Sequence, residues 1–321
     1  MTDVTASRAV SCYRFADLVV ASDESLPELP AALPGIAPDV AVSRARVPFR
    51  APVRWFQTWS AGGDPVRFGR SDGGYVVSFR ETADVIVSPD ADRIVIHAAE
   101  GLSDFKVRHV LLHQILPLVL SRRGRCVLHA SAVSWRDRVI AFVGRTGAGK
   151  STIAAACASV GAALVTDDSL VLDRAAGTWH GLPSYPGLRI HPESLDVIGR
   201  SRTNAALGSR EDRKILLTAG HDLPAFELRT LPLAWLVLVS AESSGESLRL
   251  VRGSAAAIAL ASHLFRLDVE DATESRRLFD SITDLAATIP VSELHLPRGV
   301  DLRPLVRPVL EAAGRLREDG A

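Results

Sequence analysis

A glycine-rich segment near the middle of the chain has the residue types that bind phosphate. Its residues are Gly144, Arg145, Thr146, Gly147, Ala148, Gly149, Lys150, Ser151 and Thr152. The segment fits the pattern G-x-x-x-x-G-K-[ST], in which glycines let successive backbone N–H groups turn toward phosphate oxygens. In such a loop the lysine reaches the β- and γ-phosphates and the next hydroxyl coordinates Mg²⁺. We therefore expect a site for ATP and Mg²⁺, with Lys150 and Ser151 in these two roles.

The segments on either side of the loop have the patterns that this motif requires. The apolar run RVIAFVG before it predicts a buried strand, and KSTIAAACASVG after it predicts a helix that ends at Gly161. A helix that begins at the loop directs the positive end of its dipole at the same phosphates. A chance glycine-rich turn is the alternative, but it does not account for the strand and the helix together.

Two adjacent carboxylates end the next apolar segment, AALVT. They are Asp167 and Asp168, and a phosphoryl-transfer site needs a metal-binding or proton-accepting carboxylate at this place. Side chains alternate between the faces of a strand, so one carboxylate can meet Mg²⁺ while the other faces away, unless the strand has already turned. A solvated strand end closed by an Asp-Asp-Ser turn is the alternative interpretation.

Other polar residues could add charge or proton chemistry to the site. His129 lies in CVLHASAVSW, a predicted strand that should pair with the strand feeding the loop, where its imidazole could contact phosphate or substrate. A structural histidine is the alternative. Arg189, Arg213 and Lys214 could supply positive charge, although the favoured interpretation of each is an ordinary surface charge. Arg145 should point outward from the loop.

The remaining elements indicate two folded parts joined by a helix. Residues 1–102 contain short apolar runs separated by turn signals, which predicts a mainly antiparallel β N-terminal domain with a possible role in substrate recognition. A hairpin is expected at residues 88–92. Residues 103–124 predict a linking helix that Pro117 should kink or end. Residues 125–321 alternate strands and helices, which is typical of an α/β domain.

Composition excludes several classes of protein. The 321 residues include 37 basic and 37 acidic side chains, so no net charge would attract nucleic acid or an anionic membrane. The three cysteines are far apart and form no C-x-x-C pair, which argues against a disulfide framework or a structural zinc site. The N-terminus does not look like a signal peptide, and no long uncharged apolar stretch occurs. We therefore expect a cytoplasmic protein.

Together these residues resemble the bacterial HPr kinase/phosphorylase catalytic domain and its relatives. The resemblance rests on VLHASAV, VIAFVGRTGAGKST and ALVTDDSLVL, which follow one another in the family's order with similar spacing. It implies an α/β P-loop kinase core of the HPr-kinase type in residues 125–321, after the mainly antiparallel β N-terminal domain. It also implies that His129 is an active-site residue and that Asp168 is the general base toward the acceptor hydroxyl. With Asp168 in that role, we expect Ser151 and Asp167 to hold Mg²⁺, directly or through water.

The chain also departs from the kinase/phosphorylase proper. The family's E-I-R-G-L-G segment, which supplies a glutamate to the metal, is not found, and YPGLRIHP stands in that region. His191 and Glu193 are candidates to replace the glutamate. The looser pattern is similar to that of kinases found beside biosynthetic systems for modified peptides, including lasso peptides.

These observations predict an ATP-dependent kinase that transfers the γ-phosphate to a hydroxyl, a serine of a peptide or protein above all. Three alternatives remain open: a small hydroxylated acceptor, a nucleotide-binding partner without catalysis, and an ATP hydrolase. The resemblance also implies a homo-oligomer.

Overall fold

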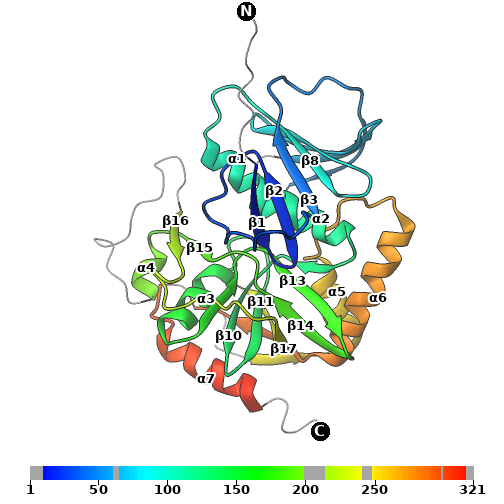
Figure 1. Ribbon diagram of the computed structural model, residues 1–321. Coiled ribbons are helices and arrows are strands. Elements are labelled where there is room, and N and C mark those ends of the chain that lie inside the picture. The colour runs from blue at the N-terminus through cyan, green and yellow to red at the C-terminus, as the bar shows by residue number, and fades with distance from the viewer. Residues whose placement is uncertain (1–9, 61–64, 199–213, 241–247, 298, 316–321) are drawn as a thin grey trace, which may run out of the picture. The chain divides into compact units, whose positions relative to one another are not determined.

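The computed structural model describes residues 10–60, 65–198, 214–240, 248–297 and 299–315 (Figure 1). The chain forms two compact units. Unit 1 comprises Met1–Arg123 and the short segment Leu267–Glu270, and unit 2 comprises Gly124–Arg266 and Asp271–Ala321. The helical run that we expected as a separate link therefore belongs to unit 1. The mixed α/β character that the sequence predicts is confirmed, with strands and helices together in unit 2.

Unit 1 is built on an eight-stranded sheet with the order β1-β2-β3-β8-β7-β6-β5-β4. Its strands are β1 (Ser11–Phe15), β2 (Leu18–Ser22), β3 (Val40–Arg44), β4 (Arg54–Trp59), β5 (Val66–Ser71), β6 (Gly74–Phe79), β7 (Ala83–Val87) and β8 (Arg93–Ala98). The hairpin predicted at residues 88–92 is confirmed, because β7 and β8 pair in antiparallel fashion on either side of it.

Two pairings of this sheet differ from the antiparallel meander that we expected. β3 runs parallel to both β2 and β8. For β2 and β3, the proline-rich connection makes this possible, because it is long enough to carry the chain back to the start of a parallel strand, which a tight turn cannot do.

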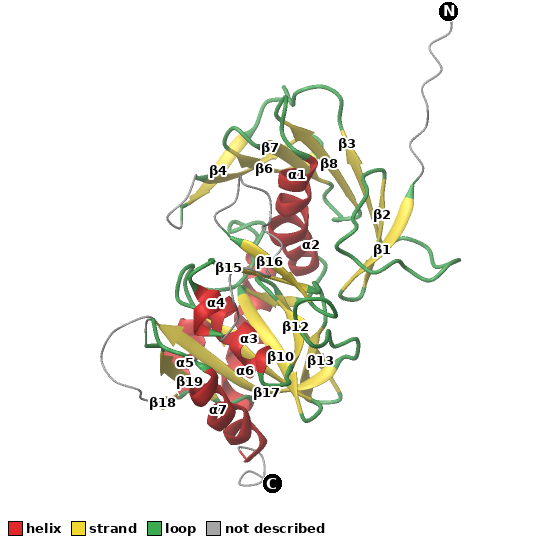
Figure 2. Cartoon of the chain, turned by 90° about the vertical axis from the view of Figure 1, so that its left-hand side faces the viewer, coloured by secondary structure: helices red, strands yellow, loops and turns green. Residues whose placement is uncertain are grey.

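The helical run of unit 1 continues through its proline. It comprises α1 (Asp104–Val110), the π-helical turn η1 (Leu111–Ile115) and α2 (Leu116–Arg122). Pro117 lacks the N–H that an α-helix would use, and the turn before it widens so that the Leu116 N–H donates to the Leu111 carbonyl. The expected break is thereby replaced by a π-turn. Figure 2 shows this run beside one face of the unit 1 sheet.

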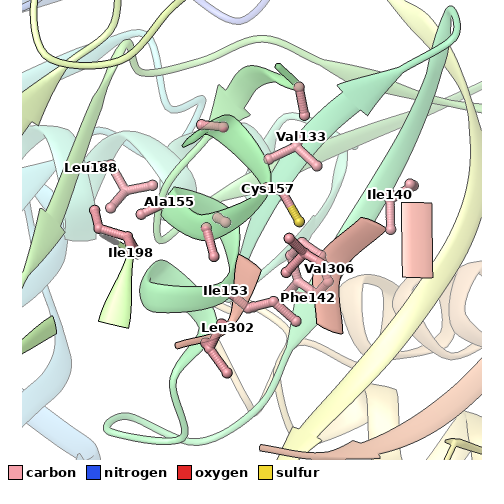
Figure 3. Close-up of a cluster of buried hydrophobic side chains, with 14 of the residues drawn as sticks. Val133, Ile140, Phe142, Ile153, Ala155, Cys157, Leu188, Ile198, Leu302 and Val306 are labelled. Atoms are coloured by element: carbon pink, nitrogen blue, oxygen red, sulfur yellow. The ribbon is translucent and has the colours of Figure 1, made fainter. Parts of the chain in front are cut away.

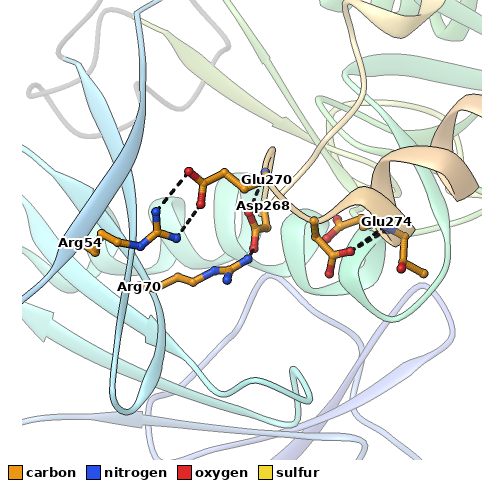
Figure 4. A network of polar contacts seen from close by, with 7 residues as sticks. Arg54, Arg70, Asp268, Glu270 and Glu274 are labelled. Carbon is orange, nitrogen blue, oxygen red and sulfur yellow. Dashed lines mark hydrogen bonds and ion pairs between the residues drawn. The ribbon is translucent and has the colours of Figure 1, made fainter.

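The segment Leu267–Glu270 is joined to the sheet of unit 1 by two ion pairs (Figure 4). The Arg70 guanidinium donates to Asp268, whose side chain is completely buried. Arg54 donates to both carboxylate oxygens of Glu270, at 3.2 and 2.5 Å. Nothing in the local sequence pattern indicated that this short segment would belong to the N-terminal unit.

Unit 2 is built on a nine-stranded sheet whose central strands β11, β17 and β19 run parallel. Its strands are β9 (Cys126–Leu128), β10 (Ala130–Trp135), β11 (Arg138–Val143), β12 (Ala163–Thr166), β13 (Leu170–Ala175), β14 (Thr178–Leu182), β17 (Leu231–Ser240), β18 (Leu248–Val251) and β19 (Val291–His295). A separate pair consists of β15 (Gly187–Ile190) and β16 (Ile215–Thr218). The helices are α3 (Lys150–Ser159), α4 (Ser194–Val197), α5 (Gly253–Ala261), α6 (Ala272–Thr288) and α7 (Arg303–Arg315).

Helix α3 lies within an apolar core, which fixes the loop that precedes it. Its residues 153–158 are completely buried, and a helix that is apolar on all sides must be covered on all sides. Figure 3 shows Ile153 and Cys157 among side chains from the strands and from α7, such as Phe142 and Val306. Among the described helices, none is long and apolar enough to cross a membrane.

Candidate active site

The glycine-rich segment connects the end of β11 to the first residue of α3. Gly147 and Gly149 have φ angles of 82° and 100°, in the left-handed region that glycine adopts without steric cost. Gly144 is required for a different reason, since a Cβ atom there would lie 2.5 Å from the Val239 carbonyl oxygen of β17. The backbone conformation thus uses the glycines as a tight turn at the N-terminus of a helix, which is an anion-binding geometry.

Lys150 is held against this loop. Its side chain is buried, and Nζ donates to the carbonyl oxygens of Gly144, at 2.9 Å, and Arg145, at 3.2 Å. Burial lowers the pKa of Lys150, while the carboxylates of Asp168 and Asp167 act in the opposite direction. The ammonium is therefore fixed in position over the loop.

Asp167 lies at the centre of the polar contacts. Its Oδ1 atom accepts hydrogen bonds from Ser131 (2.6 Å) and Ser151 (2.9 Å), and its Oδ2 atom accepts one from the Arg189 backbone N–H (2.9 Å). The side chain is completely buried. Burial, and then the charge of Asp168, raises the pKa of Asp167 to about 6. Ionisation of this carboxylate would be favoured by a cation at the same place.

Asp168 occupies a strained turn immediately after β12. Its φ angle is 66°, and the Ser169 N–H donates to the Asp167 carbonyl oxygen at 2.9 Å. This is a γ-turn centred on a left-handed residue, a conformation that is rare and costs energy. The strand has thus already turned at Asp168, which was the exception to simple alternation that the sequence left open.

His129 lies at a bend between β9 and β10, and not in the middle of a strand as we expected. The chain bends there because β9 pairs with β13, whereas β10 pairs with β11 and β12. The ring Nδ1 atom lies 3.0 Å from the Asp168 carbonyl oxygen. A carbonyl only accepts, so Nδ1 carries the hydrogen, and Nε2 of the neutral ring is an acceptor. Burial, and then the Lys150 charge, lowers the pKa of His129.

Two residues of the site were missed at the level of sequence. Ser131 lies opposite Asp167 when the register of β10 and β12 is continued by one residue, and its spacing of two from His129 was a usable signal. His263 follows α5, and its carbonyl oxygen accepts from the His129 N–H at 2.7 Å. No local pattern connects these two distant segments.

The other polar residues that the sequence suggested for the site lie in different surroundings. Lys214 lies within electrostatic range of Lys150 and His129, whereas Arg189 contributes its backbone N–H to Asp167. Arg213 lies outside the described residues. His191 and Glu193 are exposed, and within the described chain no hydrogen bond or ion pair joins either to Asp167.

Loop residues Arg145, Thr146 and Gly147 are exposed, as expected for Arg145. Thr152 Oγ1 lies 3.2 Å from the Ser194 hydroxyl of α4. In the described ranges no group of three or more His, Cys, Asp or Glu side chains could hold a metal by itself. Any metal at Asp167 would therefore need hydroxyl, water or phosphate oxygens as further ligands.

No protein-family model matches the chain, and no curated protein matches it. Among solved structures, the HPr(Ser) kinase/phosphatase from Coxiella burnetii aligns with 14% sequence identity and a TM-score of 0.34. The alignment covers 60% of this chain and 93% of that chain. A score of this size does not establish a shared fold.

Proposed function

We propose that the chain is an ATP-dependent kinase that transfers the γ-phosphoryl group to a hydroxyl, with a serine of a peptide or protein as the acceptor. The observation that carries this proposal is the contact of Asp167 with Ser151 at 2.9 Å, at the start of α3. It joins a buried carboxylate to the hydroxyl that follows Lys150. Hydroxyl and carboxylate oxygens are the hard ligands that Mg²⁺ prefers.

The loop and α3 would bind the triphosphate. The loop amides and the Lys150 ammonium, already held by the Gly144 and Arg145 carbonyls, would contact the β- and γ-phosphates. Ser151 and Asp167 would hold Mg²⁺, directly or through water. When bound, Mg²⁺ would neutralise charge on the β- and γ-phosphates.

Asp168 and His129 would act on the acceptor side. Asp168 would take the proton of the acceptor hydroxyl as its oxygen forms a bond to the γ-phosphorus. The bond from that phosphorus to the β,γ-bridging oxygen breaks, and ADP leaves. His129, with Nδ1 donating to the Asp168 carbonyl, would steady the transferring group through Nε2 when the phosphate charge favours protonation of that nitrogen.

The acceptor class rests on the sequence resemblance and not on geometry. The HPr-kinase-like order of His129, the loop and Asp167-Asp168 supports a P-loop kinase core, and the relatives beside peptide-modifying systems support a peptide acceptor. A small hydroxylated molecule is the alternative. Assembly into a homo-oligomer and a cytoplasmic location remain predictions.

A second candidate is a nucleotide-binding partner without catalysis. It is favoured by the exposure of His191 and Glu193, since neither replaces the metal-binding glutamate that the family carries. In that case the loop and Asp167 would still bind Mg²⁺ and ATP. Asp168 and His129 would then have no catalytic role.

Labelling with γ-³²P-ATP separates these functions. The purified chain is incubated with Mg²⁺ and a set of serine-containing peptides and hydroxylated small molecules, beside the Lys150→Ala variant. A labelled acceptor that requires Lys150 supports the kinase and identifies its acceptor. Saturable ATP binding with no transfer supports the binding partner, and release of labelled phosphate alone indicates a hydrolase.

A further inference from the structure

We propose that His263 is a second phosphoryl-contacting residue, which lies opposite His129 and contacts the γ-phosphate of the bound nucleotide. The inference rests on the proposed nucleotide site, because it assigns a ligand contact within that site. It adds a residue from the segment after α5 to the residues of the loop and of β12.

The register between two short segments places this histidine. Leu128 and Leu264 form an antiparallel bridge. The His129 N–H donates to the His263 carbonyl at 2.7 Å, and the Phe265 N–H donates to the Val127 carbonyl at 2.9 Å. Antiparallel pairing through Leu128 and Leu264 sets His263 directly opposite His129. Side chains that are directly opposite share one face, with Cβ atoms about 5 Å apart.

The ring of Phe265 supports the same arrangement. It meets the His129 ring edge to face, with centroids 6.1 Å apart. Residues 263–265 therefore lie antiparallel to β9 through a single bridge, and the side chains of His263 and Phe265 are part of the surroundings of His129. His129 in turn contacts the backbone carbonyl oxygen of Asp168 through Nδ1, so two hydrogen bonds connect the His263 backbone, through His129, to the backbone of Asp168.

The charged groups around His263 favour an anion. Burial, and then the charges of His129, Lys150 and Arg145, lowers the pKa of His263 to about 4. Lys150 and Arg145 are cationic, so the ring stands in a positive field. A bound phosphate group would offset this positive potential, because its negative charge attracts an N–H donor or an imidazolium.

The ring is also available to a ligand. The residue is partly exposed, and within the described chain no hydrogen bond to its ring nitrogens is present. A histidine kept only for structure would be expected to bond a neighbour, as His180 does with the Thr178 carbonyl at 3.0 Å. His180 is therefore a suitable control in the same unit.

The test compares ATP with ADP, since only ATP carries the γ-phosphate. Isothermal titration calorimetry with Mg²⁺ measures both affinities for the wild type, His263→Ala, His263→Gln, His180→Ala and Lys150→Ala. We expect His263→Ala to weaken ATP by about tenfold or more, as for the loss of one hydrogen bond to a charged group, and to leave ADP within about twofold. His263→Gln, which retains an N–H donor, should recover part of the loss, and His180→Ala should change neither affinity.

The outcomes separate this inference from the proposed function. If Lys150→Ala binds ATP as well as the wild type does, the nucleotide site itself is wrong. If binding depends on Lys150 but His263→Ala keeps the ATP-to-ADP affinity ratio, the contact is overturned. Should His263→Ala unfold, NMR of histidine-labelled wild type decides. A shift of the His263 ring signals with a nonhydrolysable ATP analogue and not with ADP supports the contact, and equal shifts refute it.

Discussion

Two aspartates in the described part of the chain are completely buried, one in each unit, and their hydrogen-bond partners differ in charge. Asp268 of unit 1 accepts from the Arg70 guanidinium and from the Glu270 N–H. Asp167 of unit 2 accepts only from two serine hydroxyls and one backbone N–H in the described part of the chain. Among the described residues, Asp268 has a cationic hydrogen-bond donor and Asp167 has none.

This difference indicates what each carboxylate does. An ion pair that brings a distant segment to a sheet is complete in itself, and removing either partner leaves an uncompensated charge. A carboxylate held by neutral donors is oriented but not neutralised. Lys150 is near Asp167 but gives its hydrogen bonds to loop carbonyls. We therefore interpret Asp268 as a structural group, and the contacts of Asp167 are consistent with the Mg²⁺-binding role proposed for it.

The adjacent carboxylate gives the largest expected effect. Asp168→Asn keeps the γ-turn, since asparagine also tolerates positive φ, but it cannot accept the acceptor proton. Turnover should fall by about a thousandfold, within the usual range for a general base, while ATP affinity changes no more than a few-fold. Steady-state kinetics and calorimetry measure the two quantities. Full turnover in this variant would remove Asp168 from the mechanism.

Asp167→Asn tests the comparison directly. An amide cannot replace the anionic oxygen toward Mg²⁺, so the Mg²⁺-dependent part of ATP affinity should fall by about a hundredfold. Titrating Mg²⁺ at fixed ATP measures it. Asp268→Asn is the matched control, because it removes an equally buried carboxylate of unit 1. Equal losses of Mg²⁺ dependence in both variants would contradict the distinction.

Much of the candidate site was readable in the sequence because its parts are local. The loop between β11 and α3 follows from glycine spacing and apolar periodicity, and the approach of Asp167 to Ser151 follows from the next strand. What could not be read depends on backbone angles and on register. The sequence Asp-Asp-Ser does not predict the positive φ of Asp168, because it is equally compatible with an extended strand end.

Non-local pairings account for the rest. The contact of His263 with His129 depends on how residues 263–265 align with β9, and periodicity does not encode such an alignment. The inclusion of Leu267–Glu270 in unit 1 has the same origin. The bend at His129 arises because β9 and β10 have different partners. In each case the local sequence pattern is compatible with the observed segment, but tertiary contacts determine which other segment it lies against.

For Asp268, the structural carboxylate, we predict that weakening its ion pair lowers stability without weakening nucleotide binding. Arg70→Gln leaves Asp268 buried with a weaker donor, and we expect unfolding of unit 1 to be easier by about 1–2 kcal/mol, less than for a fully buried pair because Arg70 is half-exposed. Urea unfolding followed by tryptophan fluorescence measures it. Arg54→Gln, at the exposed pair with Glu270, should have a much smaller effect. A reversed order would mean that burial of Asp268 does not matter.

The smallest effect concerns Glu227, a compensated carboxylate inside unit 2. It accepts from Ser134 and from the side chain and backbone N–H of Arg229. Burial opposes ionisation, but the hydrogen bonds from Arg229 and Ser134 together outweigh it and lower the pKa of Glu227. A lowered folded-state pKa contributes stability above the unfolded value of 4.5 that is lost as pH falls further.

Glu227→Gln should therefore destabilise unit 2 by about 1 kcal/mol at neutral pH. The difference from the wild type should shrink as pH falls below about 4.5. Urea unfolding at pH 7 and at pH 4 measures both values, and ATP affinity at pH 7 serves as the control. A gap that widens toward low pH would show that the carboxylate is not held in its ionised form. Unchanged ATP affinity would show that a carboxylate paired with arginine is structural even in unit 2, which carries the candidate site. The lack of a cationic hydrogen-bond donor to Asp167 among the described residues would then be a property of that site and not of the whole unit.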